Sequence, residues 1–214
     1  MKTEVIPTIL AKNRSEAVKQ LKRAARVANK VQIDIIDGKF APNKTVLPSA
    51  FIGLKSRLLF EFQLMVKQPE RLVEEIAKVK QAKLVIFHVE SLHSKKRAIE
   101  LFARARAHGL RAGIALNPET PASRIKPFLN TVNHVLVMTV QPGFMGGKFV
   151  NMAKKIRQIR NWNKKINIEV DGGIHKGTAQ LCRKAGANLF VVGSALQNAK
   201  DIKKEYAELK REVK

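Results

Sequence analysis

Strand-like and helix-like patterns of apolar residues alternate from one end of the chain to the other. Short, nearly continuous apolar runs are typical of strands buried on both faces, and apolar repeats at three- and four-residue spacing are typical of helices with one buried face. The expected strands are 4–10, 30–36, 58–66, 83–89, 111–116, 134–140, 166–170 and 188–192. Because a helical pattern follows each strand without a linker or a change of composition, the chain reads as eight repeated β-then-α units.

The ends of several helices are marked by capping residues. Gly109 is expected to end a helix in the left-handed conformation, Gly186 to end another helix, and Asp201 to cap the N-terminus of the last helix. The expected helical segments are 14–28, a short piece near 48–55, a helix opened by Pro69, 93–108, a helix that begins near Pro121, one with Phe149, Met152, Ile156 and Ile159 on one face, one that stops at Gly186, and the last one, with Ile202, Tyr206, Leu209 and Val213 inward.

Eight such units in 214 residues predict one (β/α)8 TIM barrel that forms a single domain over residues 1–214. The alternative is a doubly wound open sheet, which more often has fewer strands. In a (β/α)8 barrel the active site lies where the strands end and the βα loops begin, so polar residues at the strand ends are the candidate site residues.

Composition narrows the class of protein. The single cysteine, Cys182, excludes an intramolecular disulfide and fits a reducing compartment, and its helical surroundings indicate a small core residue. No apolar run approaches the ~20 residues of a membrane span, and the N-terminus is too short and polar for a signal peptide. We therefore expect a soluble cytoplasmic protein without a membrane partner.

The chain is strongly basic, with 41 Lys and Arg against 17 Asp and Glu and a net charge of +24. Such a field attracts phosphorylated metabolites and, without selectivity, nucleic acids. The cations recur on the polar faces of most expected helices, and only Trp162 and Tyr206 supply tryptophan or tyrosine, so no basic and aromatic stripe is present. This distribution favours a general surface adaptation and no specific nucleic-acid partner.

Two strand ends carry carboxylates. Asp34 interrupts the apolar run of VQIDIIDGKFAPN at 31–43, and Asp171 ends the strand that leads into VDGGI. A buried carboxylate costs free energy unless it is paired or hydrogen-bonded, so either both are satisfied structural aspartates or they act together. In a closed barrel they can face a substrate across the mouth, where one removes a proton and the other delivers one to the opposite face. This arrangement inverts a stereocentre next to a carbonyl through an enediolate.

Glycines follow the last two strands. Gly172 and Gly173 follow the seventh, and Gly193 and Ser194 follow the eighth. Loops at these positions of (β/α)8 barrels commonly bind phosphate through backbone N–H groups, because glycine lets an anion approach the backbone closely. Ordinary turn glycines are the alternative for each motif alone, and their combination favours phosphate.

The chain resembles the ribulose-phosphate 3-epimerase family over nearly its whole length. The stretches that carry the resemblance are PTIL at 7–10, DIIDGKFAPN at 34–43, QLMV at 63–66, HVE at 88–90, GIALNPETP at 113–121, MTVQPGF at 138–144, EVDGGI at 169–174 and GSAL at 193–196. The resemblance implies a barrel of the ribulose-phosphate-binding type, a pentulose 5-phosphate substrate and proton transfer at C3. It also places the protein in carbohydrate metabolism, in the pentose phosphate pathway, and suggests a homo-oligomer.

The resemblance also implies roles for individual residues. Asp34 and Asp171 match the acid/base pair, and Thr8 falls where the family usually has a substrate-contacting serine. The expected contacts to the substrate or its phosphate are Thr8, Gln32, Gln63, Met138, the closing loop with Gly143, Phe144, Met145 and Gly146, and the phosphate grip of Gly172, Gly173, Gly193 and Ser194.

The chain departs from the family at the metal site. The family binds a divalent metal with two histidines and the same two aspartates, and the histidine positions are Gln32 and Gln63 here. In the closing loop Met145 replaces a usual glycine, and Gly147 a usual glutamine. None of the five histidines is an obvious replacement ligand; they are His88, His93, His108, His134 and His175. We expect no zinc- or iron-type cofactor, and only weak binding of a hard divalent cation through Asp34, Asp171 and the glutamine carbonyls.

The favoured hypothesis is an epimerase that acts on a ketose phosphate, D-ribulose 5-phosphate or D-xylulose 5-phosphate, slowly or without a metal. A hexulose-6-phosphate 3-epimerase and a non-catalytic sugar-phosphate-binding barrel stay open. The retained aspartates favour catalysis, and the glutamines favour the non-catalytic alternative. A barrel whose main partner is RNA rests on the charge alone. A charge of +24 per subunit opposes close association of subunits unless the interface is spared.

Overall fold

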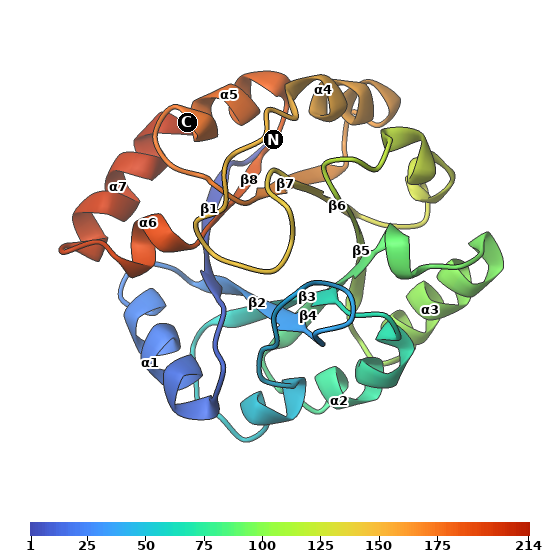
Figure 1. Ribbon diagram of the computed structural model, residues 1–214, viewed down its shortest axis with the longest axis horizontal. Helices are drawn as coiled ribbons and strands as arrows, with labels where there is room; N and C mark the ends of the chain where they lie inside the picture. The colour runs from blue at the N-terminus through green and yellow to red at the C-terminus, as the bar shows by residue number, and fades with distance from the viewer.

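The computed structural model describes residues 1–214, and its eight parallel strands close into a barrel (Figure 1). The strands are β1 Glu4–Ile9, β2 Lys30–Ile36, β3 Leu59–Met65, β4 Ala82–His88, β5 Arg111–Leu116, β6 His134–Met138, β7 Asn167–Asp171 and β8 Leu189–Val192. Each strand pairs with the next in the chain, and β8 closes the ring against β1. The predicted (β/α)8 barrel is therefore confirmed over the doubly wound alternative, whose sheet would have two open edges.

The helices surround the barrel, as Figure 1 shows. They are α1 Arg14–Ala24, α2 Val73–Ala77, α3 Lys95–Ala107, α4 Ala153–Trp162, α5 Thr178–Ala185, α6 Ser194–Gln197 and α7 Ile202–Glu212. The predicted caps are confirmed: Gly109 and Gly186 have φ of 75° and 115°, and the Asp201 side chain accepts hydrogen bonds from the backbone of Lys203 and Lys204. The short helix α6 was not predicted.

Two helical predictions were wrong in type or length, and a third, the short helical piece near 48–55, is confirmed. The helix expected to begin near Pro121 is two 3-10 turns, Ala122–Arg124 and Lys126–Phe128, because Pro127 has no N–H to donate within a longer helix. The segment opened by Pro69 starts as a 3-10 turn, Pro69–Leu72, before the five residues of α2. The short piece near 48–55 is a 3-10 turn as well, Pro48–Phe51.

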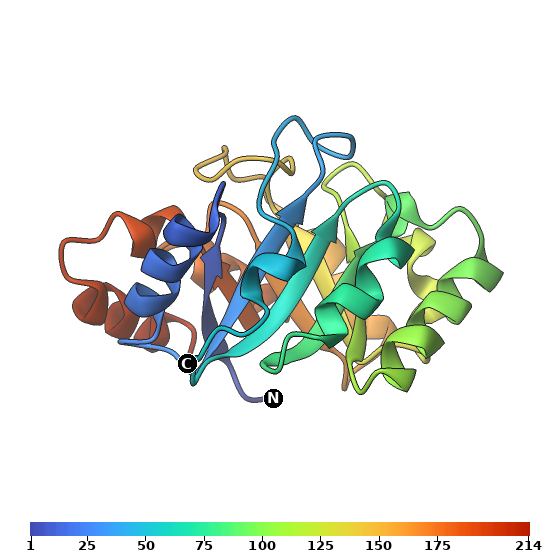
Figure 2. The same cartoon turned by 90° about the horizontal axis from the view of Figure 1, so that it is seen from below.

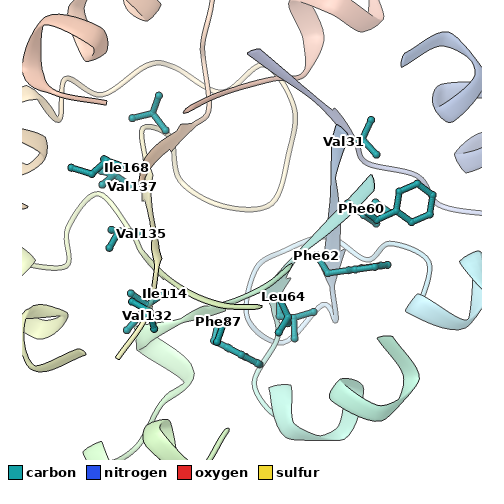
Figure 3. Packing of buried hydrophobic residues seen from close by; sticks show 14 of the residues in the cluster. Val31, Phe60, Phe62, Leu64, Phe87, Ile114, Val132, Val135, Val137 and Ile168 are labelled. Carbon is teal, nitrogen blue, oxygen red and sulfur yellow. The ribbon is translucent and has the colours of Figure 1, made fainter. Parts of the chain in front are cut away.

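The main core lies between the strands and the helices. Alternation along β3 sends Phe60, Phe62 and Leu64 outward into this layer, and Figure 3 shows them pointing away from the barrel axis with Val31 and Phe87. The same alternation sends Glu61, Gln63 and Met65 inward. The two-residue period of the strand therefore places polar side chains inside the barrel.

The C-terminal ends of the strands form one rim of the barrel, and two long loops stand above it. Figure 2 shows the loop after β2 in blue and the loop after β6 in gold on this side, with both termini on the other side. Asn43 Nδ2 donates a hydrogen bond to the backbone oxygen of Gly143 at 2.6 Å, so the two loops are joined. In Figure 1 the gold loop crosses over the centre of the barrel.

The opposite, lower half of the barrel interior holds a buried polar cluster. The inward positions there include Lys30, Glu61, His134 and Glu169, and the last three are 1%, 3% and 0% exposed. Lys30 Nζ lies 3.2 Å from a carboxylate oxygen of Glu61 and 3.2 Å from one of Glu4.

None of the helices has the length and the apolar composition that a membrane span requires.

Candidate active site

Two carboxylates meet at the mouth of the barrel. Asp34 Oδ1 accepts a hydrogen bond from the side-chain nitrogen of Gln32 at 2.8 Å, and Asp171 Oδ2 accepts one from the same nitrogen at 2.9 Å. Thr8 Oγ1 donates a further hydrogen bond to Asp34 Oδ2 at 2.9 Å. Asp34 and Asp171 are only 4% and 8% exposed. The strands that carry them, β2 and β7, are separated in the ring by β8 and β1, so closure of the barrel is what brings the pair together.

The side-chain nitrogen of Gln32 lies among three oxygens. Gln32 Nε2 also donates to Gln63 Oε1 at 2.8 Å, so three oxygens surround a nitrogen that carries two hydrogens. Gln63 Oε1 lies 2.9 Å from Asp171 Oδ2 and 3.3 Å from Asp34 Oδ1. Two atoms approach this closely when a hydrogen lies between them, and either a protonated aspartate or the nitrogen of an exchanged Gln63 amide supplies it.

Burial favours protonation of the carboxyl pair. Removal from water disfavours the charged form of a carboxyl, and burial raises the pKa of Asp171 to about 6. Burial also raises the pKa of Asp34 well above its usual value, and the charge of Asp171 raises it further. Carboxyls in such contact titrate as a pair, so near neutral pH one carries a proton and the other a charge. One acid and one base are thus available in one site.

Gln32 and Gln63 lie beneath the aspartates. Both are fully buried, and neither lines the cavity above the pair. Gln32 precedes Asp34 by two residues on the same face of β2, and Gln63 is the partner of Asp34 in the register of β2 and β3. Gln32 donates to both aspartates and Gln63 accepts from Gln32, while direct contact of either glutamine with a ligand stays a prediction.

A cavity of about 40 Å³ lies above the aspartates. The other predicted site residues all line it: Thr8, Asp34, Met138, Gly143, Phe144, Met145, Gly146, Asp171, Gly172, Gly173, Gly193 and Ser194. The volume admits only a few water molecules, so the loop of residues 141–150 has to move before a larger ligand enters.

The glycines after β7 and β8 form one wall of this cavity. Gly172 has a φ of 112°, and a Cβ built there would lie 2.3 Å from the side chain of Val140, so no other residue fits this turn. A Cβ on Gly193 would lie 3.5 Å from the sulfur of Met145. The side chain of Met145 therefore covers the glycine turn that was predicted to bind phosphate.

Several apolar residues of the cavity were not predicted. Leu10, Met65, Val140 and Ile174 line it with Pro142. Leu10 follows Thr8 by two residues, and Met65 follows Gln63 by two, so the two-residue period of a strand was a signal that could have found them. These side chains surround the carboxyls with apolar surface, which strengthens electrostatic interactions within the site.

The donor set does not fit a transition metal. No group of three or more His, Cys, Asp or Glu side chains is arranged to hold a metal ion. Gln32 Nε2, a hydrogen-bond donor, lies at the point where oxygens of Asp34, Asp171 and Gln63 converge. An amide nitrogen does not bind a cation, and only rotation of the Gln32 amide would create a set of oxygen ligands, which suits hard cations such as Mg²⁺.

The fold and the site together define a (β/α)8 barrel with two buried carboxyls beside glycine turns. Residues 4–197 match the family model described as "Ribulose-phosphate 3 epimerase family", and the chain belongs to this family. It is 34% identical over 216 residues to ribulose-phosphate 3-epimerase of Bacillus subtilis (strain 168), a match that covers 97% of this chain and 98% of the relative. It is 31% identical over 220 residues to the enzyme of Schizosaccharomyces pombe, with 100% and 95% covered. These relatives are carbohydrate epimerases, which are isomerases.

Similarity to solved structures supports the fold alone. The crystal structure of a 3-hexulose-6-phosphate synthase aligns with a TM-score of 0.75 at 17% identity, with 100% of both chains covered. The crystal structure of KGPDC from Streptococcus mutans aligns with a TM-score of 0.69 at 13% identity, with 100% of this chain and 98% of that chain covered.

Proposed function

We propose that this protein is an epimerase that inverts C3 of a ketose phosphate and interconverts D-ribulose 5-phosphate and D-xylulose 5-phosphate. The observation that carries the proposal is the pair of Asp34 and Asp171, which accept hydrogen bonds from one nitrogen of Gln32 beneath a cavity walled by glycine turns. Membership of the family and the names of the relatives support the reaction and the substrate class.

The protonation state of the pair suits the reaction. The C3 hydrogen is acidic because it lies next to the C2 carbonyl, and the charged aspartate removes it to form an enediolate. The protonated aspartate then delivers its proton to C3 from the opposite face, which inverts the centre. After the first step both carboxyls carry a proton and the substrate carries the charge. The net charge of the buried site is therefore unchanged during the reaction, and no cation has to enter.

The phosphate would bind against the glycine turns. Gly172, Gly173, Gly193 and Ser194 line the cavity, and their backbone N–H groups would bind the phosphate. The loop with Gly143, Phe144, Met145 and Gly146 would close over the sugar. Thr8 and Met138 line the same space, and Thr8 also donates to Asp34. Residues 1–214 would act as one barrel domain.

A direct assay tests the function. With ribulose 5-phosphate in D₂O, the wild type should exchange the C3 hydrogen with solvent and form xylulose 5-phosphate. Asp34→Asn should lower exchange by ~10²–10⁴-fold, the usual contribution of a general acid or base. Binding of the sugar phosphate by a wild type that exchanges no deuterium would instead favour the non-catalytic barrel, which the replaced metal-ligand positions Gln32 and Gln63 support. A parallel assay with a hexulose 6-phosphate separates the two substrate sizes.

We propose that the reaction needs no zinc or iron, on the chemistry of the donor set at Gln32. Protein purified without chelator should hold far less than one equivalent of these metals, and treatment with EDTA should leave the rate of epimerisation unchanged. Weak stimulation by millimolar Mg²⁺ is compatible with two carboxylates and two amide oxygens. Near-stoichiometric zinc, iron, manganese or cobalt that disappears in Asp34→Asn together with activity would contradict this prediction.

The sugar phosphate is the one partner that the family supports. A cytoplasmic location, the lack of a membrane partner and of a specific nucleic-acid partner, and assembly into a homo-oligomer stay predictions. Mass photometry at low and physiological salt measures the oligomeric state directly.

A further inference from the structure

A chain of hydrogen bonds leads from the aspartates to a buried histidine. Gln63 Nε2 lies 2.9 Å from His88 Nε2, and His88 Nδ1 lies 3.2 Å from Glu90 Oε2. Gln63 Oε1 accepts from Gln32 Nε2 at 2.8 Å, and this nitrogen also donates to both Asp34 and Asp171. Side chains from neighbouring strands and one loop thus connect Glu90 to the aspartates without a break.

The far end of the chain is firmly held. His88 is fully buried, and the ring of Phe40 lies against it with the ring centres 4.8 Å apart. Glu90 Oε1 accepts a hydrogen bond from the backbone N–H of Asn117 at 2.8 Å and another from Thr120 Oγ1 at 2.5 Å. Burial alone would raise the pKa of Glu90, but the hydrogen bonds from His88, Asn117 and Thr120 lower it to about 2. Glu90 is therefore a carboxylate, which only accepts hydrogen bonds.

The carboxylate sets the direction of every bond in the chain. His88 Nδ1 carries a hydrogen because it faces an acceptor, which leaves the lone pair of Nε2 to accept from Gln63. Both hydrogens of Gln63 Nε2 are then used, one on His88 and one on the sulfur of Met138 at 3.1 Å. The carbonyl oxygen of Gln63 is left to face Gln32, whose N–H groups in turn face the aspartates.

The orientation of the Gln63 amide depends on the tautomer of His88. Exchange of its oxygen and nitrogen would let the nitrogen donate to Asp171 Oδ2 at 2.9 Å and the oxygen accept from His88 Nε2 at 2.9 Å, but it would also place two amide nitrogens 2.8 Å apart, and neither accepts a hydrogen bond. It would also require a hydrogen on His88 Nε2, which in the neutral ring leaves Nδ1 with a lone pair facing the Glu90 carboxylate. His88 and Glu90 therefore select one of two amide orientations that have the same shape.

We propose that His88, anchored by Glu90, is a positioning residue for epimerisation: it fixes the Gln63 amide and, through Gln32, the orientation of Asp34 and Asp171. The proposal rests on the proposed function. Residues that orient groups one shell away from the reacting atoms commonly contribute about 10- to 100-fold, as the outer partners of metal ligands do. No contact with the substrate is involved, so the effect belongs in kcat and leaves KM nearly unchanged.

Two variants and their combination test this role. His88→Phe keeps a ring against Phe40 but removes the acceptor, and Gln63→Met keeps the length of the side chain but removes the amide. Each should lower kcat about 10- to 100-fold. The double variant should be no slower than the slower single variant, because His88 acts through Gln63. Losses that multiply in the double variant would overturn the proposal, as would a KM that rises while kcat stays unchanged.

Glu90→Gln tests the direction of the chain without a large change of shape. An amide at position 90 can donate to Nδ1, which allows the hydrogen of His88 to move to Nε2 and the Gln63 amide to turn. A drop in kcat like that of His88→Phe is expected. Glu100→Gln, which removes an exposed carboxylate on α3, is the matched control and should keep the wild-type rate. A Glu90→Gln protein that folds, as judged by its thermal transition, and keeps full kcat would contradict the proposal.

A spectroscopic readout separates this inference from the proposed function. Two-bond ¹H–¹⁵N correlation spectra of the imidazoles, with the His88 signals assigned by their loss in His88→Phe, should show the tautomer with hydrogen on Nδ1. The Nε2–H tautomer would overturn the positioning role whether or not the protein is active. The expected tautomer in a wild type without epimerase activity would mean that the proposed function has failed, while the arrangement of the amides stands.

Discussion

At the scale of single residues, the site depends on Gln32 more than on any other neutral side chain. Its nitrogen binds both aspartates and Gln63, while its own oxygen is buried without a partner. A buried carbonyl without a hydrogen bond costs ~1–3 kcal/mol. The three hydrogen bonds of the Gln32 side-chain nitrogen offset this cost. Gln32, at a position where the family resemblance implies a histidine, therefore bridges the two carboxyls with a hydrogen-bond donor.

Burial also changes the pKa values of Glu61 and Glu169, which lie below the site. Burial raises the pKa of each to about 8 from an ordinary 4.5. The folded protein therefore keeps protons that the unfolded chain has already lost, and the free energy of unfolding should fall as pH rises from about 4.5 to about 8. Burial lowers the pKa of His134 to about 4, which gives the opposite slope up to its ordinary value of 6.5. The net fall in the free energy of unfolding should be clearest between pH 6.5, the ordinary pKa of histidine, and a pH of about 8, the pKa of the two buried glutamates.

We predict that the midpoint of thermal unfolding decreases between about pH 6.5 and pH 8 in the wild type, the window set by His134 and Glu169. In Glu169→Gln, which keeps the shape but cannot ionise, the decrease should be smaller. Glu119→Gln, at an exposed site, should follow the wild type. Differential scanning calorimetry over this range measures the slope, and a midpoint independent of pH in the wild type would contradict the buried pair of acids.

At the scale of elements, the loops after β6, β7 and β8 act as one unit. The Met145 side chain of the first loop lies over Gly193 of the third, and Val140 packs where a Cβ on Gly172 would lie. Asn43, in the loop after β2, holds Gly143. A ligand that enters against Gly193 must displace Met145, so binding and loop movement are coupled.

The glycine turn after β8 provides a prediction about phosphate. Gly193→Asp should weaken binding of inorganic phosphate by roughly tenfold or more, because two unit charges 4 Å apart repel by about 1 kcal/mol even in water and phosphate carries nearly two. Gly193→Ala is the matched control, since its Cβ would lie 3.2 Å from the Thr8 methyl group and asks only for a small shift. Isothermal titration calorimetry compares the two variants. Equal affinities in Gly193→Asp and Gly193→Ala would place the phosphate elsewhere.

At the scale of the whole molecule, the charge of +24 is spread over the outer surface. One shallow groove at the N-terminal ends of β3 and β4, away from the active site, concentrates it: Lys55, Arg57, Lys78, Lys80 and Lys83 line the groove, and no acidic residue does. Anionic polymers should therefore associate with this end of the barrel through charge alone.

We predict that any binding of nucleic acid is non-specific. Affinity for unrelated RNA sequences should be similar and should fall steeply between about 50 and 200 mM salt, as counterion release requires. Replacement of Lys78, Lys80 and Lys83 by Gln should weaken binding and flatten the salt dependence while epimerisation is unaffected. Fluorescence anisotropy measures both, and one RNA sequence bound tightly at high salt would support a dedicated RNA site instead.

Much of the architecture was readable from local pattern. Strand and helix periods predicted eight β-then-α units and hence the closed barrel, because a buried parallel strand and an amphipathic helix each leave a signal in adjacent residues. The ends of helices at Gly109, Gly186 and Asp201 were predictable for the same reason. Pro127 also lies in the sequence after β5, and a proline at this place disfavours the long helix that was predicted there.

The cavity residues were largely predictable as well, since motifs at strand ends all reach the same rim once the barrel is closed. Asp34, Asp171 and the glycine turns needed only their places on the strands. What the motifs could not show was which of these side chains reach the cavity: Asp34 lines it, whereas Gln63, its partner in the register of β2 and β3, does not.

The sequence by itself determined which side chains face the inside of the barrel, because the period of a strand is local. Only the tertiary structure decided what those side chains do to one another. His88, Glu90 and Gln63 are far apart from Asp171 along the chain, and their hydrogen bonds exist because closure of the ring brings β2, β3, β4 and β7 around one axis. The raised pKa values of the aspartates and the hydrogen bonds of the amides depend on burial and on distances of about 3 Å, which no pattern of residue types contains.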